Sequence, residues 1–163
     1  MLHFLTTGVY TVYSGTGEAG SGLYYYGFPL DTVRVAGKVN GPEVHLGGIE
    51  FTTAGGTPAA RIARWNGTAW SALGSGITTS SSAVQAIRRF GGDLYAAGTF
   101  SAAGAVSARG VARWDGTNWN AVGASMFGIS TVGYGLATRP DGLGGEELLL
   151  AGIYDGIGDV ATR

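Results

Sequence analysis

The chain has 163 residues, of which 45% are hydrophobic, so it is long enough to bury one core. Ten basic and eleven acidic residues give a formal net charge of −1, so the chain lacks the broad positive field that binding to nucleic acid or an anionic membrane needs. It has no cysteine, which excludes disulfides, a thiol nucleophile and a zinc–thiolate site. No apolar run reaches the roughly 18 residues of a membrane-spanning helix.

The first thirty residues differ in composition from the rest. Residues 8–14 and 22–28 are rich in aromatic and β-branched side chains, which favour strands. The glycine-rich segment between them predicts a loose hairpin loop, so we assign residues 1–30 to an N-terminal strand hairpin. Strands are then expected at 32–39 and 44–51, on either side of an Asn-Gly-Pro turn.

A tryptophan-containing segment occurs twice. ARWNGTAWSALGSG at residues 63–76 recurs as ARWDGTNWNAVGAS at 112–125, which places Trp65 with Trp114 and Trp70 with Trp119. Each copy predicts two short strands joined around Asn-Gly or Asp-Gly, dipeptides that tolerate the positive φ of tight hairpin turns. The tryptophans, five residues apart, are expected to face each other across the hairpin.

Strand pairs precede each tryptophan hairpin. Segments 84–90 and 94–100 lie before the second hairpin, and 131–138 and 148–154 begin a third round of the same order. A full round therefore has four strands, A to D, in which C and D form the tryptophan hairpin. Four antiparallel strands per 45–50 residues predict an all-β fold of β-propeller blades. Residues 31–163 would form about three of them, divided as 31–74, 83–123 and an incomplete 131–163.

These rounds resemble a known repeat. The glycine-terminated B strand and the tryptophan hairpin resemble the kelch repeat of galactose-oxidase-type propellers, and more closely the ARWDG-type repeats of predicted bacterial surface and secreted proteins. The kelch double glycine is replaced by Ala97-Gly98 and Ala151-Gly152. The resemblance implies a non-enzymatic binding or structural module located outside the cell or on its surface. Without cysteine, the copper site and Cys–Tyr cofactor of galactose oxidase are not expected.

The third round stops at Arg163, before its tryptophan hairpin. One interpretation is that the chain is a piece of a longer propeller, whose residues 1–30 belong to a preceding blade. The other is that residues 1–30 complete the third blade of a neighbouring copy, giving a closed ring such as a six-bladed dimer, or a filament.

Catalytic motifs are lacking: the sequence has no GxSxG, P-loop or HExxH pattern. We predict no catalytic residue, metal or cofactor, and expect His3 and His45 to be structural. Two alternatives stay open. Active residues of a larger propeller enzyme or carbohydrate-binding protein would lie outside this chain, or acidic loops near Asp141 and at 155–159 would bind calcium.

Binding residues are predicted on one face. In an A-to-D meander the long loops at 52–60, 74–82, 101–108 and 123–130 emerge together, where ligand sites concentrate. Partners would be a protein, a glycan or further copies of the chain. Arg61, Arg109 and Arg163 recur before strand C and could hold an anionic partner, or pair with carboxylates or carbonyl oxygens between blades. Met126 and Phe127 are the predicted apolar anchors. The residues assigned to the repeat scaffold itself are Trp65, Trp70, Trp114, Trp119, Gly98 and Gly152.

Overall fold

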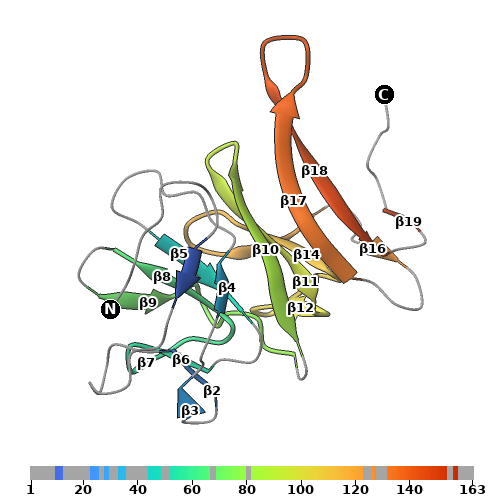
Figure 1. Cartoon of the computed structure of the whole chain (residues 1–163). Coiled ribbons are helices and arrows are strands. Elements are labelled where there is room, and N and C mark those ends of the chain that lie inside the picture. Colours follow the sequence, from blue (N-terminus) through green and yellow to red (C-terminus); the bar gives the residue numbers. More distant parts are fainter. Residues whose placement is uncertain are drawn as a thin grey trace.

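The computed structural model describes residues 10–12, 23–25, 28–29, 33–35, 44–48, 52–66, 69–79, 82–122, 126–127, 132–153 and 156–157. Every element in these ranges is a β-strand (Figure 1), which confirms the predicted all-β class. The strands form several small antiparallel sheets, and no closed ring is found among them. Nor do the described ranges contain a helix that could cross a membrane.

The second round is a four-stranded antiparallel sheet. Its strands are β10 (Ala83–Phe90), β11 (Asp93–Thr99), β14 (Val111–Trp114) and β15 (Trp119–Ala121), hydrogen-bonded in that order. The four strands expected at these places are therefore present as an A-to-D meander. Gly91 and Gly92 close the first hairpin with φ of 59° and 92°, angles that other residues rarely adopt.

The first round has three strands in the same order, β5 (Val44–Gly47), β8 (Ile62–Trp65) and β9 (Trp70–Ala72). Its A-strand segment, β4 (Val33–Val35), pairs instead with β1 (Tyr10–Val12). Strand β2 (Leu23–Tyr25) pairs with β3 (Phe28–Pro29) and with β6 (Thr53–Ala54). The sequence predicts a hairpin between 8–14 and 22–28, and the described pairing differs. Three-residue strands make few ladder bonds, so the sheets around them decide their partners.

The third round contributes the hairpin of β17 (Val132–Pro140) and β18 (Glu146–Ile153). Its register reproduces that of β10 and β11, including a bulge: the pairing shifts between Val84 and Ala86 in one hairpin and between Gly133 and Gly135 in the other. The repeat therefore extends from the sequence to the geometry of the strands.

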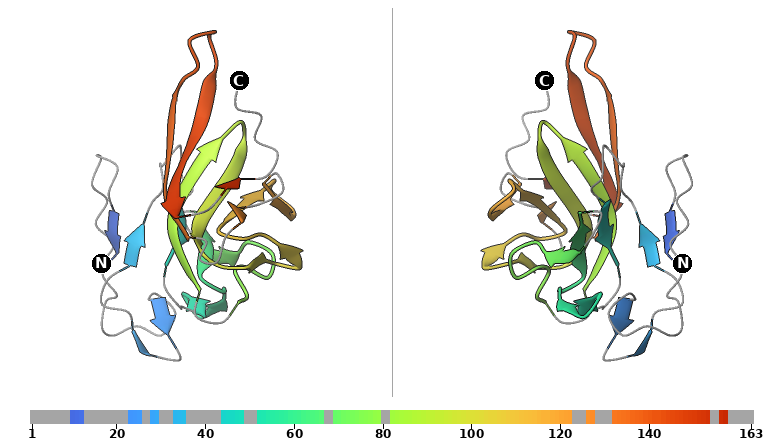
Figure 2. Two further views of the ribbon diagram at one scale, coloured as in Figure 1. Left: turned by 90° about the vertical axis from the view of Figure 1, so that its right-hand side faces the viewer. Right: turned by 90° about the vertical axis from the view of Figure 1, so that its left-hand side faces the viewer.

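The sheets of successive rounds lie side by side (Figure 2). A Cβ placed on Gly47 would lie 2.7 Å from Ile87 Cδ1, so the first sheet rests directly on β10. A Cβ on Gly133 would lie 2.8 Å from the Cβ of Ala97, so β17 rests on β11. Between the first two rounds lies the main apolar cluster, with these large side chains at its centre: Ile62, Leu73, Ile77, Val84, Ile87, Leu94, Phe100 and Trp119.

Both tryptophan hairpins have the predicted cross-strand pairs. Trp65 lies opposite Trp70 with ring centroids 5.5 Å apart, and Trp114 lies opposite Trp119 at 5.4 Å. In the second turn only Gly116 has a positive φ, 103°. Asp115 therefore contributes through its side chain rather than through a left-handed backbone.

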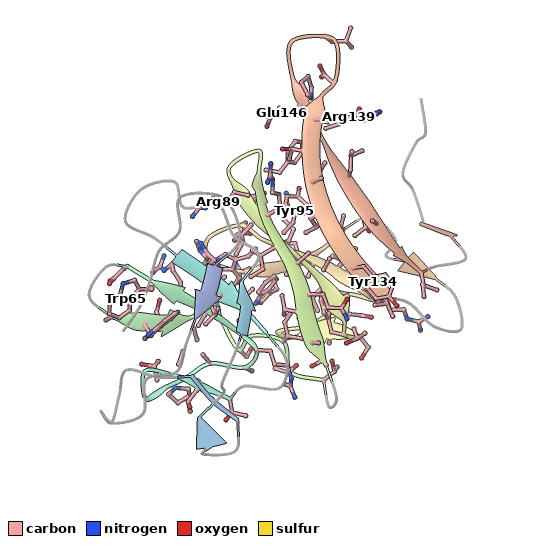
Figure 3. The ribbon with its side chains drawn as sticks, viewed as in Figure 1. Trp65, Arg89, Tyr95, Tyr134, Arg139 and Glu146 are labelled. Carbon is pink, nitrogen blue, oxygen red and sulfur yellow. The ribbon has the colours of Figure 1, made fainter. Side chains whose placement is uncertain are left out.

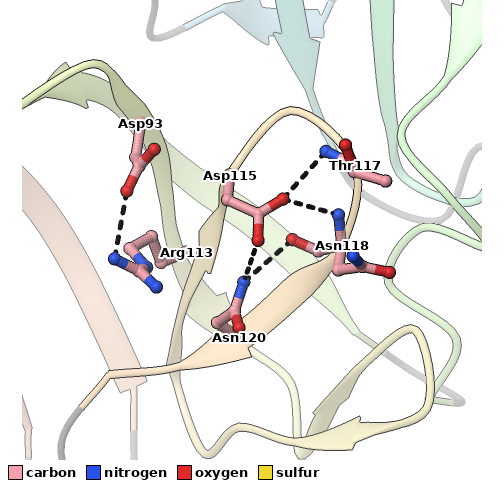
Figure 4. Close-up of polar contacts among 6 residues, drawn as sticks. All are labelled: Asp93, Arg113, Asp115, Thr117, Asn118 and Asn120. Carbon is pink, nitrogen blue, oxygen red and sulfur yellow. Dashed lines mark hydrogen bonds and ion pairs between the residues drawn. The ribbon is translucent and has the colours of Figure 1, made fainter.

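The Asp115 carboxylate organises that turn (Figure 4). Its Oδ1 accepts hydrogen bonds from the backbone N–H groups of Thr117 (2.9 Å) and Asn118 (2.7 Å), and its Oδ2 accepts one from Asn120 Nδ2 (2.9 Å). These bonds favour the charged form, so they lower the pKa of Asp115 below its ordinary value of 3.8, the bonds from Asn118 and Thr117 having the largest effect.

We predict that Asp115→Ala destabilises the protein at pH 7 and has less effect in acid. Because the folded-state pKa is lowered, the stabilisation is present above the unfolded pKa and is lost as the pH falls through the folded value. Urea denaturation at pH 7 and at about pH 2 measures the difference between the two chains. A difference that is equal at both pH values would show that the charge of Asp115 has no role.

Candidate functional site

The B–C loops and the D–A connections meet at one end of the sheets, which we call the loop end. Each B–C loop forms a small hairpin, β6 with β7 (Thr57–Pro58) in the first round and β12 (Ala102–Ala103) with β13 (Val106–Ser107) in the second. Equivalent hydrogen bonds close them, from Ala59 N to Thr52 O (2.8 Å) and from Ala108 N to Ser101 O (3.0 Å).

Hydrogen bonds join the loops of neighbouring rounds. The connection that leaves the first round reaches the B–C loop of the second, where Gly104 N donates to Gly76 O (2.7 Å) and Thr78 Oγ1 donates to Gly104 O (3.3 Å). Ser101 N also donates to Thr79 Oγ1 (3.4 Å). The predicted loops 74–82 and 101–108 thus lie together over their described residues.

The same arrangement recurs on either side. Strand β2 pairs with β6, Leu23 opposite Ala54, and β16 (Met126–Phe127) pairs with β19 (Gly156–Ile157), Met126 opposite Ile157. Met126 and Phe127 were predicted from sequence to be anchors in a loop, and the structure places their backbone in a paired strand. Ile77, the counterpart of Met126 in the first round, is fully buried.

The arginines do not align as the sequence suggests. Arg61 O accepts a hydrogen bond from Gly48 N (3.1 Å) and Gly110 O accepts the equivalent bond from Gly98 N (3.0 Å). Arg61 and Gly110 also have similar φ angles, 60° and 76°. Arg61 therefore corresponds to Gly110 and not to Arg109. The two B–C loops have the same length, since the offset of 49 that relates Thr52 to Ser101 and Ala59 to Ala108 also relates Arg61 to Gly110, so Arg109 corresponds to Ala60.

Their side chains accordingly differ in role. Arg61 Nη1 donates to Ile77 O (2.8 Å), and this bond holds the D–A connection of the first round to the end of the B–C loop of the same round. Arg109 is exposed at the loop end, and Arg163 lies outside the described residues. The two described arginines thus share no common site.

The strand-C arginines bond within their own sheets. Arg113 Nη1 lies 3.1 Å from Asp93 Oδ2, and Arg64 Nε donates to Ser71 Oγ (3.3 Å).

Trp119 forms a contact between rounds that the sequence did not reveal. Its buried Nε1 donates to Leu73 O (2.8 Å) in the first round, while a Cβ on Gly104 would lie 3.2 Å from its ring. The recurrence of tryptophan at this position indicated from the sequence that its side chain has a structural role. The carbonyl that Trp119 reaches depends on how the rounds stack, which one hairpin does not specify.

The described residues contain no group of three or more histidine, aspartate or glutamate side chains that could hold a metal ion. Asp141 Oδ1 accepts hydrogen bonds from the N–H groups of Leu143 (2.7 Å) and Gly145 (2.9 Å), which lower its pKa. It therefore closes its own turn. Asp155, Asp159 and His3 lie outside the described residues, and His45 is 7% exposed in β5.

The chain matches no protein-family model, no curated protein and no solved structure. Its function therefore has to be argued from the loop end and the packing of the rounds.

Proposed function

We propose that the chain is a non-enzymatic binding or structural module built from β-propeller blades. The observation that carries this proposal is the repeated junction at the loop end. The B–C loop of the second round is hydrogen-bonded to the connection from the first through Gly76 and Gly104, and paired strands occupy the equivalent places beside it. A rigid scaffold holding adjacent loops is the arrangement in which binding surfaces are commonly built.

The side chains at the loop end support a surface for a protein or glycan. Ser101, Ala105, Ser107 and Arg109 are exposed on the second-round loop, and Ser75 on the neighbouring connection. The backbone of Ser101 is hydrogen-bonded to Thr79 and Ala108, and Ser107 pairs with Ala102, so little ordering of this part of the loop would be needed when a partner binds. The proposed location, extracellular or on a bacterial surface, rests on the resemblance of the ARWDG-type repeat alone.

A paired substitution tests the loop end. The immobilised protein is probed with a panel of purified bacterial polysaccharides and envelope proteins, and Arg109→Glu is compared with Thr117→Glu. Both residues are exposed, but Thr117 lies in the C–D turn at the opposite end of the same sheet. We expect Arg109→Glu to weaken binding of a recognised probe at least tenfold, and Thr117→Glu to leave it unchanged.

Two results would contradict the proposal. Equal losses in the two variants would place binding away from the loop end, and cleavage of any glycan probe by the intact protein would show an enzymatic function.

A further inference from the structure

The β17–β18 hairpin leaves one face uncovered, which we call the outer face. It consists of alternate residues of β18, their partners on β17 and the bulge residue. Besides Val132 and the Arg139–Glu147 pair, these are Tyr134, Gly135, Ala137, Leu149, Ala151 and Ile153. Tyr134 and Ile153 are each 53% exposed and Leu149 is 38% exposed, and Ala137 and Ala151 are exposed as well. Figure 3 shows Tyr134 and Arg139 at the two ends of β17.

The equivalent face of the second round is covered. The common register makes Ala97 the counterpart of Ala151 and Tyr95 the counterpart of Leu149. Ala97 is 0% exposed because β17 lies against it, and Arg88 Nη2 donates to Thr138 Oγ1 across this contact (2.6 Å). The outer face is therefore equivalent to the face of the second round against which the β17–β18 hairpin packs.

Its side chains suit a sheet-on-sheet contact. Gly135, Ala137 and Ala151 are small, which allows two sheets to approach to about 10 Å. The charged side chains at its tip, Arg139 and Glu147, form an ion pair. With one cation and one anion, this edge is complementary to a second copy of itself. Uncovered apolar faces of this kind mark interaction sites.

Two arrangements of a second copy on the outer face can be compared. Head-to-tail stacking would place the first round of one copy on the outer face of another. The register of the strands makes Leu46 the counterpart of Ala96, so it lies on the side of the first round that such stacking would use. Leu46 is 0% exposed. That side is therefore already covered. The outer face of the second copy remains accessible, and two identical faces related by a two-fold axis form a closed pair.

We propose that the outer face is a homodimer interface in which the β17–β18 hairpins of two copies pack face to face. This proposal rests on the proposed function in one respect, because it uses the equivalence of the rounds. The interface itself is separate from the loop end. The dimer carries two loop ends, so it binds a repetitive surface with higher avidity than a single copy does.

Light scattering of the intact protein over a range of concentrations tests the interface. We expect a species of twice the 16.6 kDa chain mass. Ala151→Glu places a like charge on both copies and should raise the dimer dissociation constant at least tenfold. Leu143→Glu is the matched control, since Leu143 is 94% exposed in the turn of the same hairpin and lies off the outer face.

A second measurement keeps the test independent of any folding defect. The chain has no cysteine, so Leu143→Cys carries a single spin label, which should give one distance between copies that disappears when Ala151→Glu is added. A monomer at all concentrations, growth beyond a dimer, or an unaffected Ala151→Glu dimer would each overturn the proposal. Loop-end binding measured per chain in Ala151→Glu tests the proposed function separately.

Discussion

Gly98→Ala is expected to destabilise the protein by about 3 kcal/mol, because the added methyl group would clash with backbone atoms. A Cβ on Gly98 would overlap the carbonyl oxygen of Ala83 on the paired strand β10. The obstacle is backbone, which cannot rotate away as a side chain can. Gly98 N also donates to Gly110 O, so a shift of β11 would disturb the contact with the loop that leads into strand C.

The third round provides both a replicate and a control. A Cβ on Gly152 would overlap Val132 O in the same way, so Gly152→Ala should cause a comparable loss. Gly135 lies at the bulge of the same hairpin, and a Cβ there would be 3.9 Å from Ala151 Cβ, an ordinary contact. Gly135→Ala should therefore change stability by less than about 0.5 kcal/mol.

Urea denaturation followed by tryptophan fluorescence measures all three variants. Similar urea midpoints for Gly98→Ala and Gly135→Ala would show that glycine is not required at Gly98, opposite the bulge of β10.

The sequence predicted well the elements that local patterns determine. The five-residue spacing of tryptophans around a glycine turn sets the hairpin register by itself, so Trp65 lies opposite Trp70 and Trp114 opposite Trp119. The Gly91-Gly92 turn likewise joins β10 to β11 where expected. In these hairpins the residues that determine the structure are neighbours in sequence.

Two features were not predicted correctly. Arg61 was aligned with Arg109 by residue type, although the 49-residue offset that relates Trp65 to Trp114 pairs it with Gly110, as the backbone conformation does. The strand at Met126 and Phe127 also depends on β19, about thirty residues later, so its own composition gives no sign of it. The loop end is assembled from such contacts, and its hydrogen bonds could be found only in the structure.

Replacement of Trp119 is expected to cause the second large effect, because this side chain links two rounds. Trp119→Ala removes a ring that is 5% exposed within the core, and such truncations cost about 3–5 kcal/mol. Trp119→Phe retains a ring to face Trp114 but removes one of the two donors to Leu73 O, which keeps its hydrogen bond from Gly76 N (3.0 Å), a loss of about 0.5–1.5 kcal/mol. The same changes at Trp70, the half-buried counterpart in the first round, should cost less.

Hydrogen exchange distinguishes a link between rounds from a general loss of stability. The Trp119 ring lies beside Gly104, whose N–H is bonded to Gly76 O. In Trp119→Phe the Gly104 amide should therefore exchange faster, while the β17–β18 amides remain protected, since local opening can precede global unfolding. Uniformly faster exchange throughout the sheets would mean that Trp119 acts only through the core. A selective loss would instead show that this tryptophan holds the loop end in place, so its substitution should also weaken whatever the loop end binds.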